Sequence, residues 1–491
     1  MKRLMTTLLA GAAAIAFATA ANAAHPDSSG NSQQGASQGA DAAKIQQLEQ
    51  DIQDLNAQVQ DLKRSTADQY SDVQKTVSAN NTGGVKVSIN NGRPTIAGPD
   101  FSFSLRSLVQ YDSAYYGEGK EPAGTDFSSG NNFRRARFGF DGTAFNDWSY
   151  TFIYDFGGSG TEGSTIASAY LQYNGLGPVH IRAGAFPPPE SLDDATSAAD
   201  LLFLERAQPT DLARSVAGAD GRDAASIFYY DDNAFASASY TGGVVGDAAN
   251  FDEQQAFVGK AAYRFNFGEN TNLVLGADVT DVFKFSDAAA GGNSPTPLRL
   301  RERPELNVDS EGIRLIDTGS ITADSYTEWG LEAAANVHSV YGQGGYFHYE
   351  VDRHQPTSLP DPSFHGWYAQ GSWVLTGESK VYHPELGAYG SPKPAQNFTF
   401  DKGGAGAWEI AARYSDLDLN YLPGVAGLAT PVGGIRGGDQ RIWSTGINWY
   451  PNQVLRFMLD YQHVNVSRLS SSGGDLGATL DDVSLRLQIA I

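Results

Sequence analysis

The chain has 491 residues, no cysteine and a formal net charge of -22. The absence of cysteine excludes disulfides, thiolate nucleophiles and cysteine-ligated metal sites, and the acidic balance argues against nucleic acid as a partner. Beyond residue 23 no stretch approaches the length of apolar sequence that a membrane-spanning helix needs, which excludes a helical membrane protein.

Residues 1–23 have the pattern of a secretory signal peptide. Lys2 and Arg3 precede a short alanine-rich apolar run, and Ala21-Asn22-Ala23 forms a small-x-small cleavage site. A membrane anchor is the alternative, but the run is short and ends in the cleavage signal. We therefore expect an exported chain that begins at Ala24, with residues 24–40 polar, rich in Gly, Ser and Gln, and disordered.

Residues 41–78 carry a heptad pattern. The apolar positions recur at alternating spacings of three and four residues: Ile45, Leu48, Ile52, Leu55, Val59 and Leu62. Such a seam predicts a short coiled-coil helix, with an isolated amphipathic helix as the alternative, and its Ile/Val and Leu positions favour a dimer. The next segment, residues 79–99, is turn-rich and is predicted to be a linker.

From residue 100 to residue 491 the apolar period changes to two. In VSLRLQIAI, for example, Ser484, Arg486 and Gln488 alternate with apolar residues. A soluble sandwich and a transmembrane barrel both alternate in this way. Strands of ten or more residues, aromatic residues at strand ends and an alternating last strand favour the barrel. The predicted fold is all-β, a 16-stranded antiparallel transmembrane β-barrel preceded by the short N-terminal coiled-coil helix.

Arginine on the lipid face of such a barrel costs about 2–4 kcal/mol at mid-bilayer, so the strand arginines should face the lumen. In RRARFGFDG, alternation places Arg135 and Arg137 in the lumen and puts Arg134 at the end of the lipid face. The predicted lumen anion pathway consists of Arg106, Arg135, Arg137, Arg182, Arg413, Arg456 and Arg486. Each of these cations is equally compatible with a structural role, paired with Asp or Glu across the wall.

Several segments together resemble the phosphate-selective porin O and P family. They include RRARFGFDG with DWSYTFIYDF, IRAGAFPPPESL with FLERAQP, GSWVLTGESKVY, and WEIAARYSDLDLN with INWYPN. The resemblance covers most of the barrel. It implies a homotrimeric diffusion channel in the outer membrane of a Gram-negative bacterium, in contact with lipid and small anionic solutes such as phosphate or polyphosphate. It also implies no catalytic residue, metal or cofactor.

The resemblance further implies a pore constricted by a long inward-folded loop. Residues 187–223 are far longer than a hairpin turn and carry Arg206, Arg214 and Arg222, the predicted pore constriction. Cations in a narrow, low-dielectric pore concentrate anions and repel cations, and wall arginines would guide anions toward and away from them.

The sequence departs from the family pattern in three ways. Pro187 stands where family members often carry Lys, the loop holds several carboxylates, and the chain ends in Ile491 rather than an aromatic residue. The family's trimer also differs from the dimer that the heptad seam favours, and the barrel resemblance carries more weight than so short a seam.

Two other functions are compatible with these observations. A structural outer-membrane protein would contact the cell wall through the coiled coil and have little channel activity. An enzyme would need a Ser/His/acid set inside the barrel, and the scattered histidines show no such spacing. His348 and His354 with Asp352 could suggest a metal site, but a strand-end loop is the preferred interpretation, because ligand spacing alone is a weak signal.

Overall fold

The computed structural model describes residues 50, 52–66, 68, 71, 84–90, 92–120, 125–158, 163–246, 251–290, 294–401 and 403–491. The chain divides into two compact units, Met1–Asn80 and Asn81–Ile491. In the first unit residues 52–66 are helical, and the seam residues Ile52, Leu55, Val59 and Leu62 are exposed. Pairing of this helix with another stays a prediction. The predicted signal peptide and polar segment lie outside the described residues.

No helix within the described residues combines the length and the apolar character needed to cross a bilayer.

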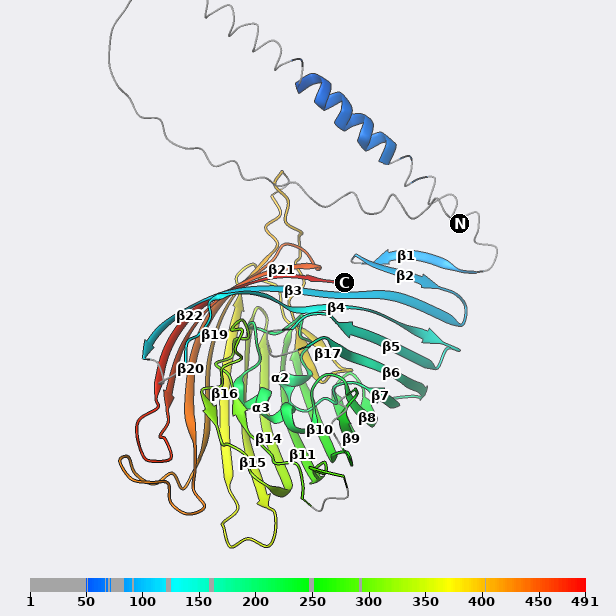
Figure 1. The fold of residues 1–491 in the computed structure, drawn as a ribbon. Helices are drawn as coiled ribbons and strands as arrows, with labels where there is room; N and C mark the ends of the chain where they lie inside the picture. The colour runs from blue at the N-terminus through cyan, green and yellow to red at the C-terminus, as the bar shows by residue number, and fades with distance from the viewer. Residues whose placement is uncertain are drawn as a thin grey trace, which may run out of the picture. The chain divides into compact units, whose positions relative to one another are not determined.

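The second unit is built almost entirely of strands (Figure 1). The elements of its first half are β1 (Lys86–Asn90), β2 (Arg93–Ala97), β3 (Phe101–Lys120), β4 (Gly130–Ala144), β5 (Trp148–Asp155), β6 (Thr165–Leu176), β7 (Val179–Ala185), α2 (Leu192–Ala195), α3 (Gln208–Ala217), β8 (Arg222–Tyr230), β9 (Ala234–Val244), β10 (Gln255–Gly268) and β11 (Thr271–Lys284). Those of its second half are β12 (Arg301–Glu302), β13 (Ile316–Asp317), β14 (Ala323–Val337), β15 (Val340–Arg353), β16 (Ser363–Val374), β17 (Val381–His383), β18 (Ala388–Gly390), β19 (Ala407–Tyr421), β20 (Ile435–Tyr450), β21 (Leu455–Ser467) and β22 (Ala478–Ala490).

Antiparallel pairing closes these strands into a barrel. Among the described residues the wall has 16 strands: β3 to β11, β14 to β16 and β19 to β22. Each pairs with the next along the chain, and β22 closes the ring on β3, with Leu485 opposite Ser113. The predicted 16-stranded barrel is therefore confirmed. Inside the predicted linker, β1 and β2 form a hairpin that adds to β3 through residues 95–97.

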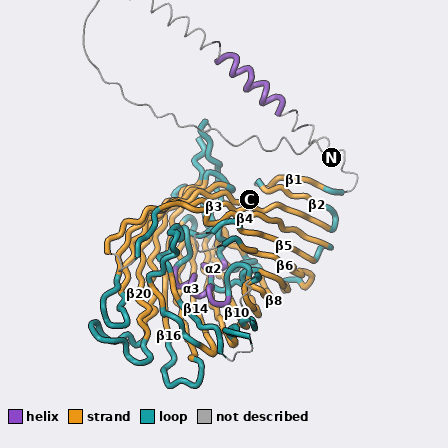
Figure 2. The backbone as a smooth tube through the Cα atoms, in the orientation of Figure 1, coloured by secondary structure: helices purple, strands orange, loops and turns teal. Residues whose placement is uncertain are grey.

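The wall alternates in burial as the period of two predicts. On β22, Ser484, Arg486 and Gln488 point inward and are buried, whereas Val483, Leu485 and Leu487 are 39–47% exposed. An apolar outer face and a polar inner face suit lipid outside and water inside. The inward side chains are buried because loops fill much of the lumen, as the teal loops and purple helices inside the orange strands show (Figure 2).

The loop 186–221, between β7 and β8, folds into the barrel and carries α2 and α3. The α3 helix buries Leu212, Ala213 and Ala217 in a core cluster with wall residues such as Val258 and Tyr349. This explains why part of the inner wall is apolar: it binds the loop. The loop is thereby held against one side of the wall, and open space remains on the side of β4, β5 and β6.

Two further connections enter the barrel. The loop 285–322, between β11 and β14, contributes Glu305, whose carboxylate accepts hydrogen bonds from the Gln208 backbone N–H at 2.8 Å and from Arg413 Nη1 at 3.0 Å. The connection 375–406, between β16 and β19, forms the β17–β18 hairpin. Lys260 Nζ donates to the Leu386 carbonyl at its tip, at 3.0 Å.

Candidate pore constriction

Among the cavities lined by the described residues, two lie beside the loop 186–221 and share part of their lining. The outer chamber, about 430 Å³, lies toward the barrel end with the long loops and is lined by residues of β4, of the loop 186–221 and of the loop 285–322. The inner chamber, about 220 Å³, is lined by β5, β6, β7 and β8, by the same loop and by the tip of the β17–β18 hairpin.

Five residues line both chambers: Arg135, Arg137, Arg206, Arg214 and Asp220. We call this set the arginine junction. Arg135 and Arg137 project from β4, and the other three come from the loop 186–221. The junction places four guanidinium groups and one carboxylate where the two chambers meet. Clustered cations in a pore of low dielectric constant favour the entry of anions over cations.

Carboxylates hold the junction arginines in place. Arg137 Nε donates to Asp155 at 2.8 Å and its Nη2 group also contacts Asp220. Arg214 Nε donates to Asp194 at 2.5 Å. The local charge is therefore far closer to balance than the arginines alone suggest. Because these pairs are partly buried, the effective dielectric constant around them is lower than at the surface, and each charge interacts more strongly with its neighbours.

The loop carboxylates at the junction stay ionised. For Asp220, the cations Arg137 and Arg214 outweigh the effect of burial and hold the pKa well below its usual range. Burial would likewise raise the pKa of Glu205, but Arg134 and the neighbouring arginines outweigh it and lower that pKa. The junction therefore carries permanent charges of both signs at neutral pH.

Arg206 positions the loop in addition to lining the pore. Its guanidinium donates to the backbone carbonyls of Asp194 and Thr196 at 3.0 and 2.9 Å. Predicted as a constriction residue with Arg206 and Arg214, Arg222 lies outside both chambers' linings. It donates to the carbonyls of Gly218 and Gly242 at 2.9 and 3.1 Å, where the loop returns to the wall.

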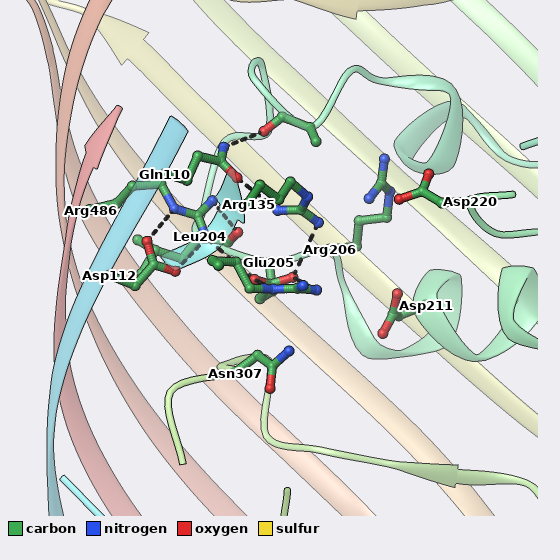
Figure 3. Close-up of polar contacts among 12 residues, drawn as sticks. Gln110, Asp112, Arg135, Leu204, Glu205, Arg206, Asp211, Asp220, Asn307 and Arg486 are labelled. Carbon is green, nitrogen blue, oxygen red and sulfur yellow. Dashed lines mark hydrogen bonds and ion pairs between the residues drawn. The ribbon is translucent and has the colours of Figure 1, made fainter. Parts of the chain in front are cut away.

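Three predicted wall arginines hold the loop. Arg486 Nη1 donates to the Leu204 carbonyl at 2.6 Å, and its other nitrogens pair with Asp112 at 2.6 and 2.7 Å (Figure 3). Arg413 Nη1 reaches the Glu205 carbonyl at 2.9 Å, and Arg456 Nη2 the Leu201 carbonyl at 2.7 Å. These three side chains face the lumen, but the loop covers them, and its backbone carbonyls accept hydrogen bonds from their guanidinium groups.

The two remaining residues of the predicted anion pathway, Arg106 and Arg182, line the inner chamber. Arg106 pairs with Asp141 at 3.3 Å. Arg182 donates from Nε to Gln172 at 2.8 Å and lies among aromatic rings. Six of the predicted arginines therefore line one or both chambers: Arg106, Arg135, Arg137, Arg182, Arg206 and Arg214. The other four lie outside both linings and hold the loop: Arg222, Arg413, Arg456 and Arg486. Arg456 also lines a separate cavity.

The expected position of Arg134 on the lipid face is wrong. The β3–β4 register shifts between Gln110 and Tyr111, which pair with Arg135 and Phe133, so a bulge at Arg134 turns two successive arginines inward. Arg134 lines the outer chamber and donates from Nε to Glu205 at 2.7 Å. Strict alternation could not reveal this, although two adjacent arginines in one strand are a signal of such a bulge.

Sequence reasoning also missed the loop 285–322, which brings Glu302, Arg303, Glu305 and Arg314 to the outer chamber. Its length, well beyond a hairpin turn, marks it as unusual but does not say whether it folds inward. The histidines considered for a metal have other contacts: His348 pairs with Glu350 at 3.2 Å and His354 with Asp324 at 2.6 Å. Across the described ranges no group of three or more His, Asp or Glu side chains is placed to hold a metal ion.

A closed antiparallel barrel with an apolar outer face, polar lumen chambers and an inward-folded loop defines an outer-membrane porin. The chain belongs to the phosphate-selective porin O and P family, whose model matches residues 103–491. The resemblance seen in the sequence is thereby confirmed. It places the protein in the outer membrane of a Gram-negative bacterium.

Individual relatives agree with this assignment. Porin O of Pseudomonas aeruginosa is 27% identical over 403 residues, which cover 77% of this chain and 86% of that protein. A second relative, an uncharacterized protein of Caulobacter vibrioides, is 26% identical over 75% of this chain and 70% of its own length. Among solved structures, an anion-selective porin from Comamonas acidovorans aligns with 80% of this chain and 100% of its own, with a TM-score of 0.50 and 13% identity, which shows the common fold.

Proposed function

We propose that this porin is a passive diffusion channel that prefers anions, and that the arginine junction sets the preference. The observation that carries the proposal is the set of residues shared by the two chambers, four arginines against Asp220. Guanidinium groups can bind phosphate or carboxylate through paired donors, and a series of weak sites permits exit as well as entry. The similarity to Porin O and to an anion-selective porin supports the same direction.

Phosphate and polyphosphate are the candidate solutes that the family suggests. Two features weaken a phosphate site in this chain: Pro187 lines the inner chamber, and the junction arginines already contact Asp155, Asp194 and Asp220. We therefore propose a general preference for anions, with phosphate as one permeant. The homotrimer is likewise a proposal, which rests on the family.

The test is the reversal potential of the purified full chain in planar bilayers under a KCl gradient, followed by titration with inorganic phosphate. Anion selectivity supports the proposal, and block of the chloride current by phosphate adds a binding site. Cation selectivity contradicts it. Absence of channel events from folded protein would instead support the structural alternative, in which the N-terminal coiled coil contacts the cell wall.

A further inference from the structure

We propose that the inner chamber is a binding subsite for organic anions that join a carboxylate to an aromatic or apolar group. This inference rests on the proposed anion pathway and specifies a solute class for one part of it. It begins from a difference between the two chambers. None of the described residues lining the outer chamber is aromatic or a large aliphatic. The inner chamber, in contrast, is lined by Ile153, Tyr170, Phe186, Pro187, Pro189, Phe228 and Leu386.

The cation of this subsite is Arg182. Its guanidinium carbon lies 4.4 Å from the centroid of the Tyr170 ring, 4.5 Å from that of Phe228 and 5.1 Å from that of Phe186. Aromatic faces attract a guanidinium, so the rings fix its position without neutralising it. A fixed cation that keeps its charge is what a carboxylate in the pore would bind.

Arg182 also differs from the junction arginines in its partners. Arg137 and Arg214 each have a carboxylate within hydrogen-bond distance. Among the described residues, the hydrogen bond of Arg182 is the one from Nε to the Gln172 amide oxygen at 2.8 Å, and no carboxylate lies within ion-pair distance. A solute carboxylate can therefore bind Arg182 without displacing an acidic residue of the protein. Arg106 in the same chamber adds a second positive charge, although Asp141 lies 3.3 Å from it.

The apolar lining supplies the second half of the recognition. Ile153 projects from β5 into the lumen, between the inward-facing Thr151 and Asp155. Pro187 and Pro189 face the chamber from the start of the loop 186–221 and carry no backbone N–H to hydrate. A ring or branched alkyl group attached to the carboxylate would remove apolar surface from water here, which a hydrated phosphate or acetate does much less.

The size of the chamber limits the solute. At about 220 Å³ it is smaller than the roughly 300–1,000 Å³ of sites for drug-sized ligands. It therefore fits a single ring with a carboxylate, such as benzoate, better than a larger aromatic acid. The order of the two chambers also follows: a solute would be drawn in by charge in the outer chamber and sorted by its apolar group in the inner one.

The experiment compares acetate, benzoate and phosphate as blockers of the chloride current through single channels of the full chain in planar bilayers. Before any blocker is added, the reversal potential in the same bilayer reports anion preference. We expect benzoate to block at a concentration about three- to tenfold lower than acetate. Arg182→Gln should weaken block by both carboxylates. Ile153→Ser should reduce the advantage of benzoate over acetate and leave acetate block unchanged.

Lys120→Gln is the matched control, because Lys120 lies at an exposed strand end, paired with Asp475. It removes one positive charge without touching the chamber and should leave benzoate block unchanged. Anion-selective channels in which benzoate and acetate block equally would overturn the subsite and leave the proposed function intact. Equal effects of Arg182→Gln and Lys120→Gln would also overturn it. A channel without anion preference would overturn both proposals.

Discussion

At the scale of single residues, the junction combines strong opposite charges in a small space. Arg137 touches both Asp155 and Asp220, and Arg214 lies between Asp194 and Asp220. Because cations and carboxylates are close to balance there, the sign of the excess depends on one or two side chains. Ion selectivity should therefore respond to single substitutions much more than the fold does.

The first prediction compares the removal of a negative charge from the junction with the removal of a positive one. Asp220→Asn removes a carboxylate that stays ionised because nearby arginines hold its pKa low, so the ratio of chloride to potassium permeability should rise several-fold. Arg137→Gln removes a cation that lines both chambers and should lower the ratio. Reversal potentials in a KCl gradient measure both. Shifts of the same sign in the two variants would contradict control by the junction.

Residue-level prediction placed side chains correctly where alternation decides which face they take, while the role of the lumen arginines in anion passage stays a prediction. Arg135 and Arg137 face the lumen because lipid excludes them from the other face. It failed at Arg134, where a bulge breaks the alternation, and it could not tell a pore arginine from a loop anchor. Arg413 and Arg486 do point inward, but whether a loop lies on them depends on tertiary contacts that no local pattern encodes.

At the scale of elements, the loop 186–221 is held by the wall on several sides. Arg486 forms a buried two-bond pair with Asp112 and also donates to a loop carbonyl. Asp460 accepts from the Leu204 backbone N–H at 3.0 Å, and α3 packs on the apolar part of the wall. A constriction that depends on loop position needs such anchors to keep a constant size.

Loss of an anchor gives the second prediction. Arg486→Met leaves Asp112 buried without its partner, which should cost about 3–5 kcal/mol of stability and increase current noise from loop motion. Heat-dependent migration of the folded barrel in gels and single-channel recordings report the two effects. In the control Arg441→Met, the lost guanidinium is 55% exposed and water can reach its pairs with Asp439 and Asp416, so the cost should be about 1 kcal/mol. Equal losses in both variants would contradict the anchor role.

The third prediction concerns pH. Burial, followed by the charge of Asp194, raises the pKa of Glu190 in the loop from 4.5 to about 8, while a hydrogen bond from Thr280 opposes the shift. The charged groups facing Glu190 are Asp194 and Arg214 of the loop segment, Asp278 of β11 and Glu328 of β14, with the phenols Tyr326 and Tyr349 nearby.

The pKa of Glu190 is higher when the loop 186–221 is packed against the wall (seated) than when the loop is released. The carboxyl therefore keeps its proton in the seated loop. The protonated Glu190 stabilises the seated position of the loop. This stabilisation is fully present below about pH 4.5 and is lost as the pH rises to about 8, where the carboxyl of the seated loop itself ionises. Loop noise should therefore grow over this range and then level off. Glu190→Gln should remove this pH dependence. Glu302, whose pKa burial and Asp211 raise to about 8, lies in the loop 285–322, so Glu302→Gln serves as a comparison at a second buried loop carboxyl. An unchanged pH profile in Glu190→Gln would contradict the assignment.

At the scale of the whole molecule, the barrel was predictable because its rule is simple: one face of every strand meets lipid. The inward-folded loop was expected from the family resemblance, and length and arginines only selected residues 187–223 as the candidate segment. The connections 285–322 and 375–406 were not predicted, because loop length alone does not say whether a loop folds inward or outward. Their path is set by partners such as Glu305 with Arg413 and Lys260 with Leu386, far apart in the sequence.

The last prediction separates the two units of the chain. Every wall strand among the described residues, the three connections that enter the barrel and both chambers lie within Asn81–Ile491, so deletion of residues 41–78 should leave single-channel conductance and selectivity unchanged. Mass measurement of the purified deletion variant in detergent tests assembly at the same time. A retained trimer assigns assembly to the barrel, as the family suggests, whereas a smaller particle assigns it to the helix.

The same deletion decides between the channel and the structural alternative, in which the N-terminal segment contacts the cell wall. The exposed apolar seam residues Ile52, Leu55, Val59 and Leu62 are free to pair with other copies or with another partner. If the deletion abolishes retention by purified cell wall but leaves conductance intact, the protein joins both roles in separate units. A loss of conductance would contradict the independence of the barrel, because no residue that lines either chamber has been removed.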